Sequence, residues 1–132
     1  MKRVLVDMSA TLFHHGHIRI LKRASSFGQV VVALTLDEEV IKVKGYTPEI
    51  PFHGRREILE AIRYVDEVIP APWLINNDFL SQHNIDLLVH GEDNSNEVDG
   101  DKLMNLPRTA GISSTIMRAR VLKAVAGFIN PN

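Results

Sequence analysis

The chain has 132 residues, of which 45% are hydrophobic and 23% are charged, and its formal net charge is −1. This length fits one domain over residues 1–132, and the near-zero charge excludes a basic surface for non-specific binding to nucleic acid. The absence of cysteine excludes disulfides, thiol catalysis and cysteine-type zinc sites. No stretch approaches membrane-spanning length, so we expect a cytoplasmic protein that does not act in a membrane.

Short apolar runs alternate along the chain with stretches of helical periodicity. The runs predict strands at residues 4–6, 30–34, 68–69 and 87–89, with a weaker strand at 103–106. The periodic stretches predict helices at residues 16–27, 53–64, 78–83 and 113–125, and residues 45–51 and 92–101 are expected to be loops. This order predicts an α/β fold, a Rossmann-like open parallel sheet of about five strands flanked by helices and joined by right-handed crossovers.

The sequence His14-His15-Gly16-His17 lies between the first predicted strand and the first predicted helix. Ligands of open α/β sheets bind beyond the carboxyl ends of the strands, so this junction is a favoured position for a site. Gly16 lets a phosphate approach the backbone, and the helix N-terminus supplies free N–H donors. His14 and His17 can face one ligand and donate hydrogen bonds to phosphate oxygens. The alternative is a zinc site, for which two histidines without a nearby carboxylate form a sparse ligand set.

A second phosphate site is predicted at the start of the last helix. The segment there reads Arg108-Thr109-Ala110-Gly111-Ile112-Ser113-Ser114-Thr115. Ser113 is a good N-cap, Ser114 and Thr115 add hydroxyl donors, and Arg108 adds a planar guanidinium. A capped surface helix without function is the alternative, and spacing alone does not separate the two interpretations.

The two segments together resemble the H-x-G-H and R-T-x-G-I-S-T-T signatures of the cytidylyltransferase-like nucleotidyltransferases. The resemblance runs from Arg3 to about Val121 and is closest to the glycerol-3-phosphate cytidylyltransferases. It implies transfer of CMP from CTP to a small phospho-alcohol such as glycerol 3-phosphate, with release of pyrophosphate. It also implies Mg²⁺ bound with the nucleotide, no metal held by protein side chains alone, and a homodimer.

The resemblance implies roles for individual residues as well. His14, His17 and Lys44 are the implied catalytic residues, with Lys44 acting from a loop and Lys42 as its rival. Nucleotide contacts are implied for Ser9, Ala10, Gly16, Arg63, Gly91, Glu92, Arg108, Thr109, Gly111, Ser113, Ser114 and Thr115. Contacts with the acceptor are implied for Thr11 and Trp73.

The chain departs from the family's usual G-T-F-D at Met8-Ser9-Ala10-Thr11. Thr11 stands where the resemblance implies an aspartate that helps to hold a cationic head group, so phosphocholine becomes a less attractive acceptor. This segment is also similar to domains that activate phosphonates such as 2-hydroxyethylphosphonate. Two further hypotheses stay open, an ATP-dependent adenylyltransferase and a non-catalytic nucleotide-binding module in which the altered segment marks lost chemistry.

Overall fold

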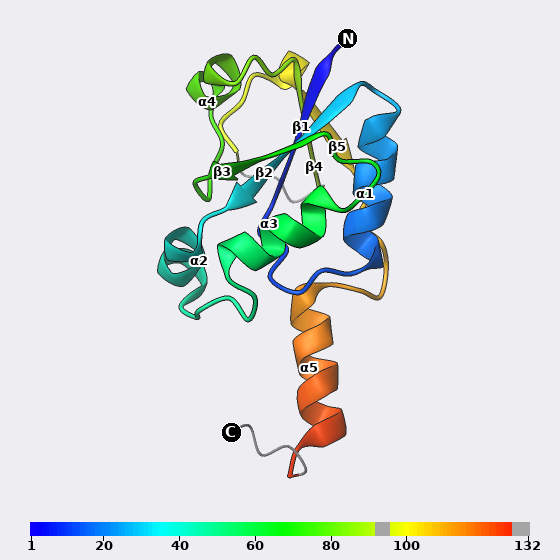
Figure 1. The fold of residues 1–132 in the computed structure, drawn as a ribbon, viewed down its shortest axis with the longest axis vertical. Helices are drawn as coiled ribbons and strands as arrows, with labels where there is room; N and C mark the ends of the chain where they lie inside the picture. Colours follow the sequence, from blue (N-terminus) through cyan, green and yellow to red (C-terminus); the bar gives the residue numbers. More distant parts are fainter. Residues whose placement is uncertain (92–95, 128–132) are drawn as a thin grey trace.

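The computed structural model describes residues 1–91 and 96–127, and it confirms the predicted α/β architecture. Five parallel strands form one sheet in the order β3-β2-β1-β4-β5 (Figure 1). Their bounds are β1 Arg3–Met8, β2 Gln29–Thr35, β3 Glu67–Ala71, β4 Leu87–Gly91 and β5 Leu103–Leu106. Because the chain leaves β1 toward β2 on one side and returns to β4 on the other, the order of strands switches beside β1, where ligands of such sheets bind.

Helices connect the strands, and their bounds differ from the predictions in two places. The described residues form α1 His15–Ser25, α2 Asp37–Lys44, α3 Phe52–Glu60, α4 Asn77–Gln82 and α5 Ser114–Val125, with a short 3₁₀ turn at Gly100–Lys102. Helix α2 was not predicted, and α3 ends four residues earlier than expected. The reason for the early end is that the N–H groups of Ala61 and Ile62 bond to carbonyls three residues back, which tightens the last turn.

The sheet is buried on both faces, as a parallel sheet requires. Val4 and Val6 of β1 face one apolar cluster, which includes Leu21 of α1 and Leu59 of α3. Leu5 faces the opposite cluster, which is closed by α4 and its flanking segments. Side chains alternate along a strand, so β1 contributes to both clusters. Its position in the sheet is therefore held by apolar packing on both faces.

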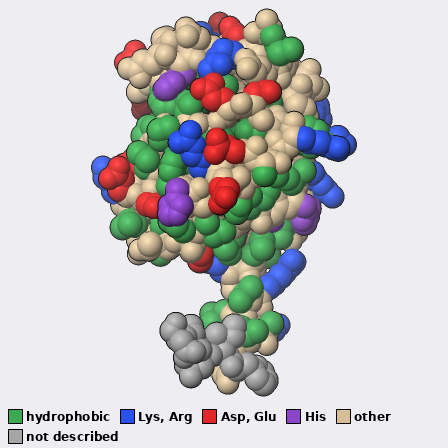
Figure 2. Space-filling view, viewed as in Figure 1, with side chains coloured by type: hydrophobic (Ala, Val, Ile, Leu, Met, Phe, Trp, Pro, Cys, Tyr) green, Lys and Arg blue, Asp and Glu red, His purple; other side chains and the backbone are tan. Residues whose placement is uncertain are grey.

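Helix α5 stands apart from this core. None of its residues is buried, and it projects from the body of the molecule in both the ribbon and the space-filling view (Figures 1 and 2). The hydroxyl of Ser113 accepts a hydrogen bond from the N–H of Ile116 (3.0 Å), and the hydroxyl of Ser114 donates to the carbonyl of Leu12 (3.1 Å). These two hydrogen bonds are polar contacts that hold the start of α5.

Within residues 1–91 and 96–127, we find no helix with the length and the apolar character needed to span a membrane.

Candidate active site

A cleft of about 720 Å³ opens at the carboxyl ends of the strands. Its walls come from the β1–α1 loop, the end of α2 with the segment that follows it, and the β5–α5 loop. Of the predicted site residues, those that line it are Ser9, Thr11, His14, Gly16, His17, Lys44, Trp73, Gly91, Arg108, Thr109, Ser113, Ser114 and Thr115. The fold thus brings the two predicted phosphate sites, from opposite ends of the chain, into one cleft.

The two histidines of the first turn are held by backbone hydrogen bonds. The N–H of Gly16 donates to Nδ1 of His14, and the N–H of His14 donates to Nδ1 of His17, each at 3.1 Å. The ring centroids of His14 and His17 lie 3.9 Å apart, and the ring of His17 stacks on that of Phe13. A nitrogen that accepts from a backbone N–H carries no proton, so each neutral ring carries its proton on Nε2. The turn therefore presents two Nε2–H donors side by side.

Burial keeps both rings neutral. It lowers the pKa of His17 to about 3, and the nearby His14 and Arg108 act in the same direction. Burial and the neighbouring His15 likewise lower the pKa of His14. With no phosphate bound, both imidazoles are therefore uncharged hydrogen-bond donors at neutral pH.

This perturbation predicts how folding stability depends on pH. Unfolded His17 binds a proton near pH 6.5 and folded His17 near pH 3, so the unfolded state binds more protons between these values. The contribution of neutral His17 to the free energy of unfolding is complete above about pH 6.5 and is lost as the pH falls toward 3. The loss in the free energy of unfolding is on the order of 1–2 kcal/mol by pH 5. Urea unfolding at pH 7 and pH 5 measures it. The His17→Asn variant should lose less over the same interval, and an equal loss would contradict the assignment.

Gly16 is required by the packing of His14. A Cβ at position 16 would lie 2.9 Å from Cε1 and Nδ1 of His14, which is closer than real Cβ atoms approach. Any larger residue therefore displaces the ring that Gly16 itself holds through its N–H. The sequence suggested a different reason for Gly16, namely room for a phosphate to approach the backbone. Both reasons concern the cleft surface, since Gly16 and His14 both line it.

Lys44 lies in the cleft wall, but not in a loop as predicted. It is the last residue of α2, which ends at Gly45 with a left-handed φ of 79°. The Lys44 ammonium lies 5.5 Å from the ring centroid of Trp73, which also lines the cleft. Residues two apart on a helix point in different directions, and Lys42 does not line the cleft. The geometry therefore favours Lys44 over Lys42.

The cleft is strongly cationic although the chain as a whole is not. Its described lining contains five arginine and lysine side chains, at positions 19, 23, 44, 108 and 118, and a single carboxylate, Asp7. Asp7 is engaged, because His90 Nδ1 contacts one of its oxygens and the Asn96 amide donates to the other at 2.9 Å. A partly enclosed cluster of one sign concentrates the field, so the cleft suits a polyanion.

Three described residues with predicted contacts, Arg63, Ala10 and Gly111, do not line the cleft. Arg63 lies before β3, at the amino ends of the strands, where its guanidinium covers the ring of Tyr64. Its position gives no support to a nucleotide contact within one chain. Ala10 packs into the core with a left-handed φ of 46°, and Gly111, with φ 78°, turns the β5–α5 loop without lining the cleft. Glu92 lies outside the described residues.

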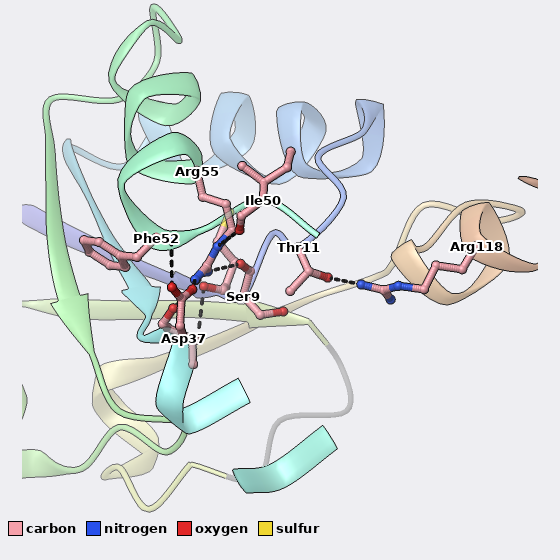
Figure 3. Close-up of polar contacts among 9 residues, drawn as sticks. Ser9, Thr11, Asp37, Ile50, Phe52, Arg55 and Arg118 are labelled. Carbon is pink, nitrogen blue, oxygen red and sulfur yellow. Dashed lines mark hydrogen bonds and ion pairs between the residues drawn. The ribbon is translucent and has the colours of Figure 1, made fainter. Parts of the chain in front are cut away.

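One buried cation supports the cleft from behind and had no predicted role. Arg55 of α3 is 1% exposed, and its guanidinium lies among Ser9, Ile50 and Asp37 (Figure 3). It donates to the carbonyls of Ser9 (2.6 Å), Thr35 (2.9 Å) and Ile50 (3.0 Å) and to the carboxylate of Asp37 (2.5 Å). Arg55 thereby ties the loop after β1 to the loop after β2.

Sequence reasoning also missed several polar lining residues, among them Asp7, Arg19, Arg23, His90 and Arg118. Asp7 and His90 lie at the ends of β1 and β4, and Arg118 lies on α5. A signal existed for Asp7 and His90, because each is a polar residue at the carboxyl end of an otherwise apolar run. No comparable pattern marks Arg118.

Comparisons with known proteins agree with this geometry. Residues 9–120 match the model of the family described as cytidylyltransferase-like. The chain is 39% identical to the glycerol-3-phosphate cytidylyltransferase of Bacillus subtilis (strain 168), over 92% of this chain and 98% of that protein. It is 35% identical to the ethanolamine-phosphate cytidylyltransferase of Arabidopsis thaliana, over 93% of this chain, and it spans about a third of that relative (33%).

Two further comparisons are more distant in kind. The FAD synthase of Pyrococcus horikoshii is 34% identical, over 88% of this chain and 78% of that protein. Among solved structures, the lipopolysaccharide core biosynthesis protein of Thermoplasma volcanium GSS1 superimposes with a TM-score of 0.63 at 18% identity, covering 94% of this chain and 88% of that one, which supports the fold alone. Together with the family match over 9–120, these findings confirm the predicted family: the chain belongs to the cytidylyltransferase-like family.

Proposed function

We propose that this chain is a nucleotidyltransferase that transfers CMP from CTP to a small phospho-alcohol, with release of pyrophosphate. The observation that carries the proposal is the paired Nε2–H donors of His14 and His17 in a cleft lined by five cations. The named relatives support the choice of CTP and of a phosphorylated acceptor such as glycerol 3-phosphate.

The proposed reaction is an in-line displacement. An oxygen of the acceptor's phosphate attacks the α-phosphorus of CTP, a new P–O bond forms, and the bond to pyrophosphate breaks. His14 and His17 donate to α-phosphate oxygens that gain charge in the transition state. Arg108, Thr115 and the N–H groups at the start of α5 bind the outer phosphates, together with Lys44. Catalysis then consists of positioning and charge neutralisation, without a covalent enzyme intermediate.

Mg²⁺ enters this proposal as a partner of the nucleotide. Among the described residues no cluster of three histidine or carboxylate side chains could hold a metal ion by itself. The one carboxylate in the described lining, Asp7, is already bonded to His90 and Asn96. The residues present therefore fit an ion that is held mainly by phosphate oxygens and water, the ligands that Mg²⁺ prefers. When bound, such an ion would neutralise part of the charge of the triphosphate.

The acceptor is proposed to bind beside Trp73 and Thr11. Thr11 is 1% exposed, and its hydroxyl accepts a hydrogen bond from Arg118 at 2.7 Å. A hydroxyl, unlike a carboxylate, offers no negative charge to a cationic head group. We infer an acceptor with an uncharged head group, either glycerol 3-phosphate or a hydroxyalkyl phosphonate such as 2-hydroxyethylphosphonate. We also propose a cytoplasmic homodimer, and a solution mass of twice the 14.8 kDa chain would support the dimer.

The proposal is tested by release of pyrophosphate. The purified chain is given Mg²⁺, either CTP or ATP, and one acceptor from a panel of glycerol 3-phosphate, 2-hydroxyethylphosphonate, phosphoethanolamine and phosphocholine. We expect turnover with CTP and one of the first two acceptors. Turnover with ATP and not with CTP would identify an adenylyltransferase. This hypothesis is included in the test because the chain is similar to a FAD synthase. Binding of CTP without turnover would identify a binding module.

A further inference from the structure

Arg118 joins three segments that surround the cleft. Its Nη2 donates to the hydroxyl of Thr11 at 2.7 Å and to Oε1 of Glu49 at 2.6 Å, and its Nε donates to Oε2 of Glu49. The guanidinium also lies over the ring of Tyr46, 4.5 Å from its centroid. Figure 3 shows Arg118 reaching from α5 to Thr11. One side chain thus connects α5, the β1–α1 loop and the segment between α2 and α3.

The positions of these segments suggest what the connection does. Tyr46 and Glu49 lie two and five positions after Lys44, so the segment that Arg118 holds begins close to the predicted phosphate-binding lysine. Arg118 lies one helical turn after Ser114 and therefore on the same face of α5, at the end of the helix that opens into the cleft. Since α5 contributes no buried residue, polar contacts such as those of Arg118 and the hydrogen bond from Ser114 to Leu12 help to fix where its N-terminus lies.

We propose that Arg118 and Glu49 form a clasp that positions Lys44 and the N-terminus of α5 around the triphosphate of the nucleotide. Arg118 is then a positioning residue, and the clasp rests on the proposed function because it acts on the triphosphate site of that reaction. The bidentate pairing supports it, since a planar guanidinium facing both oxygens of a carboxylate fixes orientation as well as distance.

The charges and the exposure of the pair agree with a positioning role. The hydrogen bond between them lowers the pKa of Glu49 and raises that of Arg118, so both are charged at neutral pH. The side chains are 25% and 40% exposed for Arg118 and Glu49, and exposed ion pairs contribute little to global stability. Loss of the clasp is therefore expected to leave the thermal midpoint within about 4 °C of the wild type. The affinity for the nucleotide is expected to be more sensitive to loss of the clasp than global stability is, because a small misplacement of binding groups weakens their contacts with the ligand.

The experiment measures affinity by calorimetry, with CTP and Mg²⁺ as one ligand and CMP as the other. The variants are Arg118→Gln, Glu49→Gln, both together, and the exchanged pair Glu49→Arg with Arg118→Glu. The control is Arg56→Gln, which removes the Arg56–Glu60 ion pair on α3, away from the described cleft lining. Each single variant is expected to weaken CTP binding on the order of tenfold and CMP binding less than about twofold.

Two further results are expected of a clasp. The double variant should bind CTP no more weakly than either single variant, because the partners act through one contact. The exchanged pair should regain part of the lost affinity, and the Arg56→Gln control should bind as the wild type does.

Other outcomes overturn the proposal. If Glu49→Gln binds CTP normally while Arg118→Gln does not, Arg118 contacts phosphate directly and no clasp exists. Equal losses for CTP and CMP, or no loss in either single variant, would refute it as well. A wild-type chain that binds CTP but releases no pyrophosphate would end the proposed function and leave the clasp standing, so the two failures are distinguishable.

Discussion

The His17→Asn variant is expected to fold as the wild type does and to lose at least about a hundred-fold in turnover. The amide oxygen of asparagine can replace Nδ1 as the acceptor for the N–H of His14, which in the wild type donates at 3.1 Å. Asparagine has no group at the place of Nε2, so the donor to the α-phosphate is lost. Removal of one such preorganised donor typically raises the barrier by about 3–4 kcal/mol.

The matched variants are His17→Gln and His17→Ala. The glutamine amide nitrogen can reach the place of Nε2 without supplying the Nδ1 acceptor, so this variant should keep more turnover than His17→Asn while it is less stable. Alanine removes both functions and should lose turnover and stability together. Steady-state rates of pyrophosphate release and urea unfolding measure the two properties. Near-wild-type turnover in His17→Asn would remove His17 from the chemistry.

The largest expected effect on stability comes from Arg55→Met, with a loss of about 3–5 kcal/mol in the free energy of unfolding. Methionine fills much of the same volume but makes none of the four hydrogen bonds of the guanidinium. The carbonyl of Thr35 then loses a charged donor in a buried place, and the part-buried carbonyl of Ser9 and the carboxylate of Asp37, whose side chain is 38% exposed, lose the same donor. Removing a buried cation lowers the free energy of unfolding more than removing a surface cation, because its acceptors are left without a hydrogen-bond donor.

The neighbouring arginine provides the control for this prediction. Arg56 lies on the same helix, its side chain is 45% exposed, and it forms an ion pair with Glu60 at 3.5 Å. Its replacement by glutamine should change the unfolding free energy by no more than about 0.5 kcal/mol. Urea titrations of the two variants give the comparison directly. Similar midpoints for Arg55→Met and Arg56→Gln would contradict the buried network drawn in Figure 3.

The positions of the strands along the chain and their parallel arrangement could be predicted from the sequence, because a buried parallel sheet requires continuous apolar runs. All five predicted strands were confirmed, including the weak one, which is Leu103–Leu106. Helix α2 was missed because Val40 is its one buried residue, so its apolar periodicity is faint. Its acidic first turn and its terminal glycine are signals of another kind, which depend on the helix dipole and on capping rather than on burial.

The candidate site was predictable where its residues adjoin each other along the chain. His14, Gly16 and His17 form a local turn, and local spacing determines their geometry. Arg55 was recognisable in part, since its spacing from Leu59 places it on the apolar face of α3, where a charge requires partners. Which carbonyls it binds depends on three loops that only the tertiary fold brings together.

The clasp residues could not have been found from the sequence in this way. Glu49 and Arg118 are 69 positions apart, and neither belongs to a recognisable local motif. Their contact depends on the direction in which α5 leaves the sheet. That direction follows from the left-handed Gly111 and the cap at Ser113, whose conformations a sequence suggests but does not measure.

The central place of β1 has a consequence for the order in which a nascent chain can fold. This strand is made first, yet it pairs with β4, whose residues Leu87 to Val89 lie more than eighty positions downstream. A ribosome must therefore release most of the chain before the sheet can close on both sides of β1. Until then one edge of an apolar strand is open to wrong partners. The cleft, which takes lining residues from both β1 and β4, can therefore assemble only after β4 has been made.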